Sequence, residues 1–193
     1  MPVRLVILAS GSGSTLQAVL DAASEPGFPA EIVAAGTDRP GCAAMQRAER
    51  AGVPTFARAL AQFASRDEWD AALAEELARW SPDLVVLAGF MRVIGAATVT
   101  RFPMVNTHPS LLPSFPGAHA VADALAHGVK LTGVTVHRVD AGLDSGPILA
   151  QAAVPVLDDD TEDSLRERVQ NAEKPLFVET IRQLCQSLEG TPK

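Results

Sequence analysis

The sequence has few of the features that would place it outside the globular proteins. It contains only two cysteines, Cys42 and Cys185, each isolated in a helical pattern, so we expect neither a disulfide nor a cysteine-bound metal. It has no dense run of lysine or arginine and a formal net charge of −7, which argues against a nucleic-acid partner held mainly by phosphate contacts. No apolar run approaches the roughly 20 residues that span a bilayer. These absences predict a soluble protein of the reducing cytoplasm, with no nucleic-acid or membrane partner.

The bulk composition is that of one folded domain. The 193 residues are 47% hydrophobic and 20% charged, which is enough to bury a substantial core in a single domain, residues 1–193. The first ten residues, MPVRLVILAS, are superficially similar to a short signal segment. Their apolar run is brief and passes directly into a glycine loop, so we interpret it as a buried first strand. We find no internal repeat, low-complexity tract or linker.

Strand and helix patterns alternate through the first half of the chain, which predicts an α/β fold with a Rossmann-like, doubly wound, mostly parallel sheet. The helix from Arg66 to about Trp80 begins with a predicted capping box of Ser65 and Glu68. Its apolar stripe indicates core packing. In the second half, Pro155 predicts an edge strand, and residues 189–193 are expected to fray. The expected strands are residues 3–9, 31–37, 53–57, 83–88, 104–108, 131–139 and 148–156, and the expected helices include 41–51, 118–127 and 162–188.

The loop after the first strand has the composition of an anion site. Residues 10–15, SGSGST, lie between a predicted strand and a predicted helix, an arrangement that turns backbone N–H groups and a positive helix end towards a phosphate. The loop lacks the third glycine of a dinucleotide motif and the lysine of a P-loop. It therefore favours a small phosphate ester, while an ordinary tight turn between strand and helix is the alternative that the sequence leaves open.

The most informative stretch is residues 104–119, MVNTHPSLLPSFPGAH. Side chains alternate along a strand, so Asn106 and His108 face the same way, roughly 7 Å apart. Pro109 biases His108 towards extended geometry, which keeps this pairing. An amide and a titratable imidazole therefore share one face at the carboxyl end of a strand, where open α/β sheets bind ligands.

An acidic side chain, Asp144, is presented by the glycine-containing loop DAGLDSGP at residues 140–147. A carboxylate beside an imidazole favours the charged ring and orients it, and the amide of Asn106 is suited to stabilising an oxyanion. The sequence contains no nucleophile elbow. The predicted chemistry is therefore general acid–base catalysis without a covalent enzyme intermediate. The sequence alone does not show that Asp144 reaches His108.

Two other interpretations of the histidines stay open. His108 is as compatible with a hydrogen-bonded structural role as with catalysis, and His119, His127 and His137 have no comparable polar neighbours in the sequence. A zinc site formed by His108, Asp144 and a further histidine has little support, because no ligand pair has H-x-x-x-H or C-x-x-C spacing. We therefore expect no metal.

Four motifs together resemble the folate-dependent formyltransferases. They are residues 9–18, 87–92, 105–119 and 140–147, and they span nearly the whole chain in the order of the members that act on glycinamide ribonucleotide. The resemblance implies transfer of a formyl group from 10-formyltetrahydrofolate, as co-substrate, to the amine of glycinamide ribonucleotide in purine biosynthesis. Asn106, His108 and Asp144 match the catalytic trio of the family.

The resemblance also implies binding roles, with the substrate site in the N-terminal half and the folate and catalytic loops in the C-terminal half. Glu173 matches the acidic residue near the amino end of the substrate. The substrate-phosphate loop is matched by Gly13, Ser14 and Thr15, and the folate-side positions by Arg66, Met91, Arg92, Val93, Ile94, Asn106, Asp140 and Asp144. Some relatives carry a phosphate-binding lysine where this chain has Ser114. The phosphate would then depend on backbone N–H groups, hydroxyls and either Lys174 or an arginine.

Related activities remain as alternatives. A formyltetrahydrofolate hydrolase would be expected to carry an N-terminal regulatory domain, but Val3 already belongs to the first predicted strand. A methionyl-tRNA formyltransferase would be expected to carry a further C-terminal domain and a basic surface, and a sugar-nucleotide formyltransferase would need a nucleotide site. A non-catalytic folate-binding module would not need the three polar residues together. The sequence fits a monomer or a homodimer.

Overall fold

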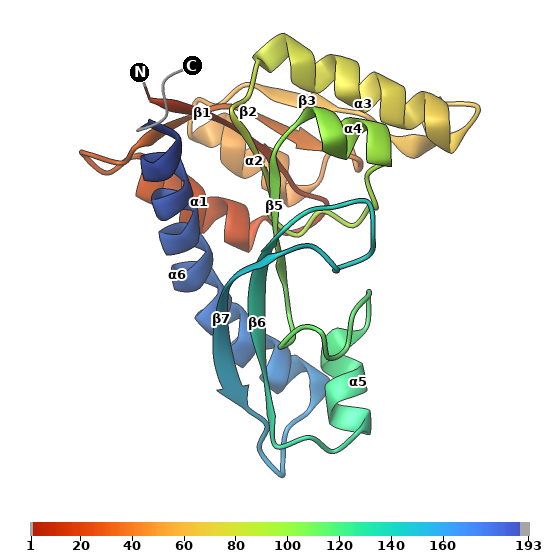
Figure 1. Ribbon diagram of the computed structural model, residues 1–193, viewed down its shortest axis with the longest axis vertical. Coiled ribbons are helices and arrows are strands. Elements are labelled where there is room, and N and C mark those ends of the chain that lie inside the picture. Colours follow the sequence, from red (N-terminus) through yellow and green to blue (C-terminus); the bar gives the residue numbers. More distant parts are fainter. Residues whose placement is uncertain (1, 190–193) are drawn as a thin grey trace.

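The computed structural model describes residues 2–189 and is built on a seven-stranded sheet of order β3-β2-β1-β4-β5-β6-β7 (Figure 1). Strands β1 to β5 are parallel to one another, β6 pairs antiparallel with β5, and β7 pairs antiparallel with β6. The strands are β1 (Val3–Leu8), β2 (Ala30–Thr37), β3 (Thr55–Ala57), β4 (Leu84–Leu87), β5 (Met104–His108), β6 (Leu131–Arg138) and β7 (Ile148–Pro155). The predicted α/β, mostly parallel sheet is confirmed, and β7 lies at the edge as Pro155 indicated.

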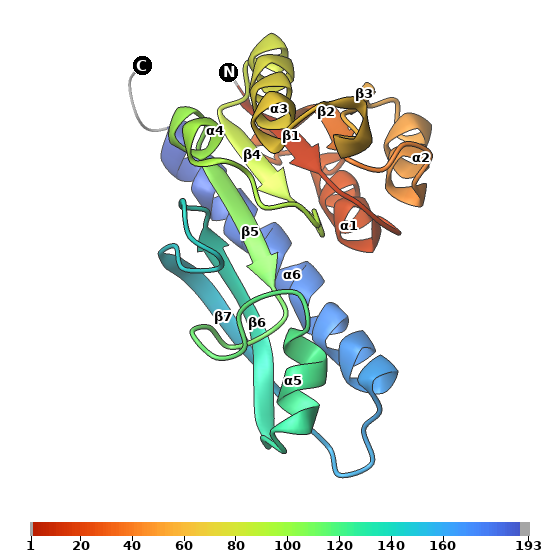
Figure 2. The same cartoon turned by 90° about the vertical axis from the view of Figure 1, so that its right-hand side faces the viewer.

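Helices cover both faces of this sheet, as a doubly wound fold requires (Figures 1 and 2). One core cluster joins β1 to α1, α2 and α6 through residues such as Ile7, Leu16 and Phe177. A second cluster on the opposite face packs Val6 and Leu8 against α3. The helices are α1 (Ser14–Ala23), α2 (Ala43–Arg50), α3 (Arg66–Trp80), α4 (Ala96–Arg101), α5 (Ala120–Ala126) and α6 (Glu162–Glu189), with a short 3-10 helix, η1 (Leu60–Gln62).

The local patterns account for most of these elements. The side chains of β4 are all buried, as expected for a strand covered on both faces. In α3, Ser65 Oγ accepts a hydrogen bond from Glu68 N at 3.1 Å, while the Glu68 carboxylate reaches Ala64 N rather than Ser65 N. The predicted core stripe is confirmed, since Trp69, Leu73 and Leu77 are buried.

Two short elements, α4 and η1, were not predicted. Each is less than two turns long and has no clear apolar period, so tertiary contacts rather than a sequence pattern define it. Helix α6 reaches Glu189, and the rest of the predicted frayed end lies outside the described residues. Within residues 2–189, none of the helices combines the length and apolar character needed to cross a membrane.

The strand order creates a switch point between β1 and β4. The chain leaves β1 towards β2 on one side, whereas β4 pairs with β1 on the other. The loops after β1 and β4 therefore line a crevice at the carboxyl ends of the strands. Ser10 N donates to Gly89 O at 3.1 Å, which ties these two loops together. The same edge receives the end of β5, where Asn106 and His108 lie.

Candidate active site

The three predicted polar residues meet at the end of β5. The 140–147 loop, which joins β6 to β7, brings Asp144 Oδ2 to 3.3 Å from His108 Nδ1. Gly117 N, from the loop after β5, donates to the same Asp144 oxygen at 2.9 Å. The structure therefore places Asp144 against His108, a contact that the sequence left open.

His108 has an oxygen acceptor at each ring nitrogen. Its Nε2 lies 2.8 Å from the backbone carbonyl oxygen of Phe115, and its Nδ1 faces the Asp144 carboxylate. A neutral imidazole carries only one N–H, so it can satisfy only one of these acceptors, whereas the imidazolium donates to both. The ring is therefore held between two acceptors, one at each nitrogen.

A further histidine, His137, completes this cluster. No sequence pattern had singled it out. His137 lies opposite Asn106 in the β5–β6 pairing, and its Nε2 is 3.3 Å from Asn106 Nδ2. Its Nδ1 is 2.9 Å from Arg138 O, so Nδ1 donates there and Nε2 accepts from the amide. His137 is buried and fixes which way the Asn106 amide points. The sequence showed only that His137 belongs to a strand, from the alternation of residues 131–139. It did not show which residue lies opposite, because strand register is not visible in the sequence.

A cavity of about 190 Å³ lies at the end of β5. It is lined by Thr107 and Pro109, which flank His108 in the chain, and not by Asn106, His108, His137 or Asp144. The glycine–serine loop, the loop after β4, Thr107 and Pro109 of the β5 end, and one face of α6 form its walls. Thr107 Oγ1 is buried and has no hydrogen-bond partner among the described residues, which leaves an unsatisfied hydroxyl next to the cavity. The lining residues are Gly11, Ser12, Gly13, Ser14, Thr15, Ala88, Gly89, Met91, Thr107, Pro109, Val121, Arg166, Val169, Gln170 and Glu173.

The predicted phosphate-loop residues and Glu173 are thus brought together. Gly13 has a φ of 74°, and a Cβ added there would lie 2.6 Å from Ala44 Cα, so only glycine fits. Thr15 Oγ1 donates to Glu173 Oε1 at 2.9 Å. Burial raises the pKa of the Glu173 carboxyl, against the opposing effects of the Thr15 hydrogen bond and of Lys174.

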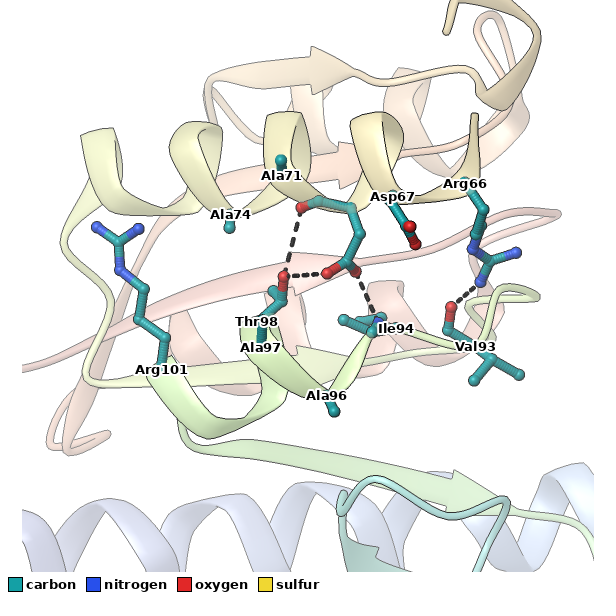
Figure 3. A pocket seen from close by; sticks show the side chains of 12 residues that line it. Arg66, Asp67, Ala71, Ala74, Val93, Ile94, Ala96, Ala97, Thr98 and Arg101 are labelled. Atoms are coloured by element: carbon teal, nitrogen blue, oxygen red, sulfur yellow. Dashed lines mark hydrogen bonds between the residues drawn. The ribbon is translucent and has the colours of Figure 1, made fainter. Parts of the chain in front are cut away.

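The residues predicted to bind folate are divided between two places. Arg66, Val93 and Ile94 line a separate cavity of about 670 Å³ between α3 and α4. Figure 3 shows Arg66 at one end of it, donating to the carbonyl oxygen of Val93, and Arg101 at the other end. Met91 lines the smaller cavity instead. Asp140 braces its own loop by accepting from Gly142 N and Ser145 Oγ, at 3.0 and 2.9 Å.

Arg92 lines neither cavity. Its Nε donates to Asp38 Oδ2 at 2.7 Å, and the other oxygen of the buried Asp38 accepts from Ser10 Oγ. Ser10 Oγ in turn accepts from Met91 N at 2.8 Å. The Asp38 carboxylate therefore holds the loops after β1, β2 and β4 together, and no sequence pattern indicated this residue.

Comparison with known proteins places the chain in a family. Residues 3–181 match the family described as formyl transferase. The chain belongs to that family. It is 55% identical to the phosphoribosylglycinamide formyltransferase of Mycobacterium tuberculosis over 95% of this chain and 86% of that protein. The glycinamide ribonucleotide transformylase 1 of Symbiobacterium toebii superposes with a TM-score of 0.93 at 46% identity, covering 96% of this chain and 89% of that one.

A second solved structure agrees. The phosphoribosylglycinamide formyltransferase of Brucella melitensis has a TM-score of 0.90 at 43% identity and covers 96% of both chains. The recognised family and the formyltransferase fold are confirmed, and the chain is an enzyme of formyl transfer that uses a folate-derived donor. Within residues 2–189, no group of His, Cys, Asp or Glu side chains is arranged to hold a metal ion.

Proposed function

We propose that the chain transfers the formyl group of 10-formyltetrahydrofolate to the amine of glycinamide ribonucleotide, a step of purine biosynthesis. The observation that carries the proposal is the position of His108 between the Phe115 carbonyl and the Asp144 carboxylate. Thr107 and Pro109, on either side of His108 in the chain, line a cavity together with the glycine–serine loop. The names of similar relatives agree with formyl transfer to this acceptor.

The catalytic residues would act on charge that develops at the formyl carbon. The substrate amine attacks this carbon, and the carbonyl electron pair moves onto oxygen. Asn106 donates a hydrogen bond to the resulting oxyanion, and the positive charge of protonated His108 stabilises it. Asp144 stabilises the imidazolium and orients a water molecule. The proton lost by the amine passes through that water to the folate nitrogen, the carbon–nitrogen bond to folate breaks, and tetrahydrofolate leaves.

His137 would contribute by orienting the amide. The Asn106 side-chain nitrogen has two N–H donors, and the contact with His137 Nε2 occupies one of them. The second donor is then left for the oxyanion. A preorganised donor of this kind is worth more than a freely rotating one, because no reorganisation is needed when the charge develops.

The other predicted residues would bind the two substrates. Gly13, Ser14 and Thr15 would hold the phosphate, and Glu173 would lie near the amino end of the acceptor. The residues that we propose on the folate side are Arg66, Met91, Arg92, Val93, Ile94, Asn106, Asp140 and Asp144. Arg92 would act through its backbone and through its ion pair with Asp38. We propose one domain over residues 1–193, acting in the cytoplasm on small molecules alone, as a monomer or a homodimer.

The test is spectrophotometric. Tetrahydrofolate release from the 10-formyl donor is followed with glycinamide ribonucleotide, with an unphosphorylated amine, and without acceptor. The proposal predicts release that requires the ribonucleotide. Equal release in water alone would instead identify a hydrolase, and no release from folded protein under any condition would favour a non-catalytic binding module.

A further inference from the structure

The small cavity has one cationic side chain in its wall. Helix α6 contributes Arg166, Val169, Gln170 and Glu173, whose spacing places them on one face of the helix. Among the described residues that line the cavity, only Arg166 carries a positive charge. Arg166 and Glu173 lie two helical turns apart, roughly 10 Å along the axis, so the wall is basic at one end and acidic at the other.

The charge of a phosphate ester needs such a partner. A phosphomonoester carries between one and two negative charges at neutral pH, while the glycine–serine loop offers only uncharged N–H and hydroxyl groups. Ser114, which stands where some relatives have a lysine, supplies no charge and is not part of the cavity wall. A cation elsewhere in the wall supplies the countercharge that the loop lacks.

Two other cations near the site are less suited to this task. Arg47 Nε donates to Ser12 O at 2.9 Å, and its Nη1 donates to Gln17 at 3.3 Å, so its guanidinium is already engaged by groups of the protein. Lys174 follows Glu173 on α6 and lowers the pKa of that carboxyl, but it does not line the cavity. Neither residue shares the cavity wall with the glycine–serine loop.

Arg166 is free to change partner. It pairs with Glu162, one turn earlier on α6, and both side chains are about half exposed. Such solvated single pairs are weak, whereas a phosphate accepts two parallel N–H bonds from a guanidinium. Moving from Glu162 to a bound phosphate leaves the carboxylate in water rather than buried and unpaired, so the exchange carries little penalty.

We propose that Arg166 binds the phosphate of the acceptor substrate and thereby selects phosphorylated over unphosphorylated acceptors. This inference rests on the proposed function for the identity of the acceptor, but the cavity and its charge do not depend on it. The missing lysine at position 114 is replaced by a cation from a different element, the N-terminal half of α6.

The first experiment compares Arg166→Gln with Arg79→Gln. Arg79 is a matched control, since it is a helical arginine paired with a glutamate of its own helix, on the opposite face of the sheet. For Arg166→Gln we expect the KM for the ribonucleotide to rise roughly 10- to 100-fold, the range of a lost charge-assisted hydrogen bond, with kcat and the KM for folate unchanged. Arg79→Gln should leave all three constants unchanged. An unchanged ribonucleotide KM in Arg166→Gln, or the rise in Lys174→Gln instead, would overturn the proposal.

The second experiment needs no turnover. Inorganic phosphate should raise the Tm of the wild-type protein and of Arg79→Gln, but not of Arg166→Gln, because only a bound ligand stabilises the native state. Equal stabilisation of the three proteins, or of none, overturns the role of Arg166. Arg166-dependent stabilisation without turnover of the ribonucleotide would reject the proposed function and keep the phosphate site. Turnover of the ribonucleotide with an unaltered KM in Arg166→Gln would keep the proposed function and reject the role of Arg166.

Discussion

Replacing Asp38 with alanine tests whether one buried carboxylate holds the loops after β1, β2 and β4 together. The side chain of Asp38 is fully buried. It accepts hydrogen bonds from Arg92 Nε at 2.7 Å and from Ser10 Oγ. Hydrogen bonds to a charged group contribute about 1.5–3 kcal/mol each, and breaking a buried ion pair costs about 3–5 kcal/mol. The Arg92 side chain is 33% exposed and regains water when its partner is removed, so we expect the lower end, about 3 kcal/mol.

The measurement is the free energy of unfolding, or Tm, with circular dichroism as the probe. For a chain of this length, 1 kcal/mol shifts Tm by about 2–4 °C, so Asp38→Ala should lower Tm by about 6–12 °C. The matched control is Arg39→Ala. Arg39 lies 4.0 Å from the same carboxylate with its side chain 60% exposed, and an exposed pair of this kind contributes at most about 1 kcal/mol. A Tm for Asp38→Ala no lower than that of Arg39→Ala would refute the reasoning.

Three further predictions concern the site itself. His108→Ala should lower kcat by more than about 100-fold while the dissociation constant for folate changes little, because the charge of His108 stabilises the oxyanion; equal losses in both would indicate a binding role. Burial raises the pKa of Glu173, so the native state holds this proton to higher pH than the unfolded chain and stability falls as pH rises from the ordinary carboxyl range to the raised pKa. The Tm of Glu173→Gln relative to wild type should therefore increase from acidic to neutral pH, and a constant difference would contradict this. Gly13→Ala should cost about 2–4 kcal/mol of stability, from its positive φ and from contact with Ala44; a Tm equal to wild type would show that the loop is not confined.

Much of the fold could be predicted because its strands are buried on both faces. Apart from Arg4 and Asp83, residues 3–9 and 83–88 are apolar runs, and β1 (Val3–Leu8) and β4 (Leu84–Leu87) occupy them almost to the residue. Alternation with amphipathic helices then leaves few topologies for a parallel sheet. Helix α4 has no such pattern. It is defined by Asp70 of α3, which accepts from Gly95 N at 2.6 Å and from Thr98 Oγ1 at 2.7 Å.

The candidate site was predictable where its residues are neighbours in the chain. Asn106 and His108 share a face because of strand alternation, and the glycine–serine loop follows directly from the strand–loop–helix order. His137 and Asp38 were missed because their partners are distant in sequence. His137 meets Asn106 through the register of an antiparallel pair, and Asp38 meets Arg92 through the order of strands in the sheet. Neither register nor strand order leaves a local pattern in the sequence.

Arg166 is a binding residue that the sequence could not single out either. The resemblance implied that backbone N–H groups, hydroxyls and either Lys174 or an arginine would hold the phosphate where Ser114 replaces a lysine, and it did not distinguish between these cations. Only the packing of α6 beside the glycine–serine loop separates Arg166, which lines the cavity, from Lys174, which does not. A binding residue supplied by a distant helix is identified by the cavity wall it forms rather than by its neighbours in the chain.

The most direct test of formyl transfer follows the formyl carbon itself. The enzyme is incubated with 10-formyltetrahydrofolate that carries an isotopic label in the formyl group, together with glycinamide ribonucleotide, and the products are observed by nuclear magnetic resonance. The proposed function predicts that the label appears as a formamide on the ribonucleotide, in an amount equal to the tetrahydrofolate released. Label recovered as free formate, with the ribonucleotide unchanged, would contradict it.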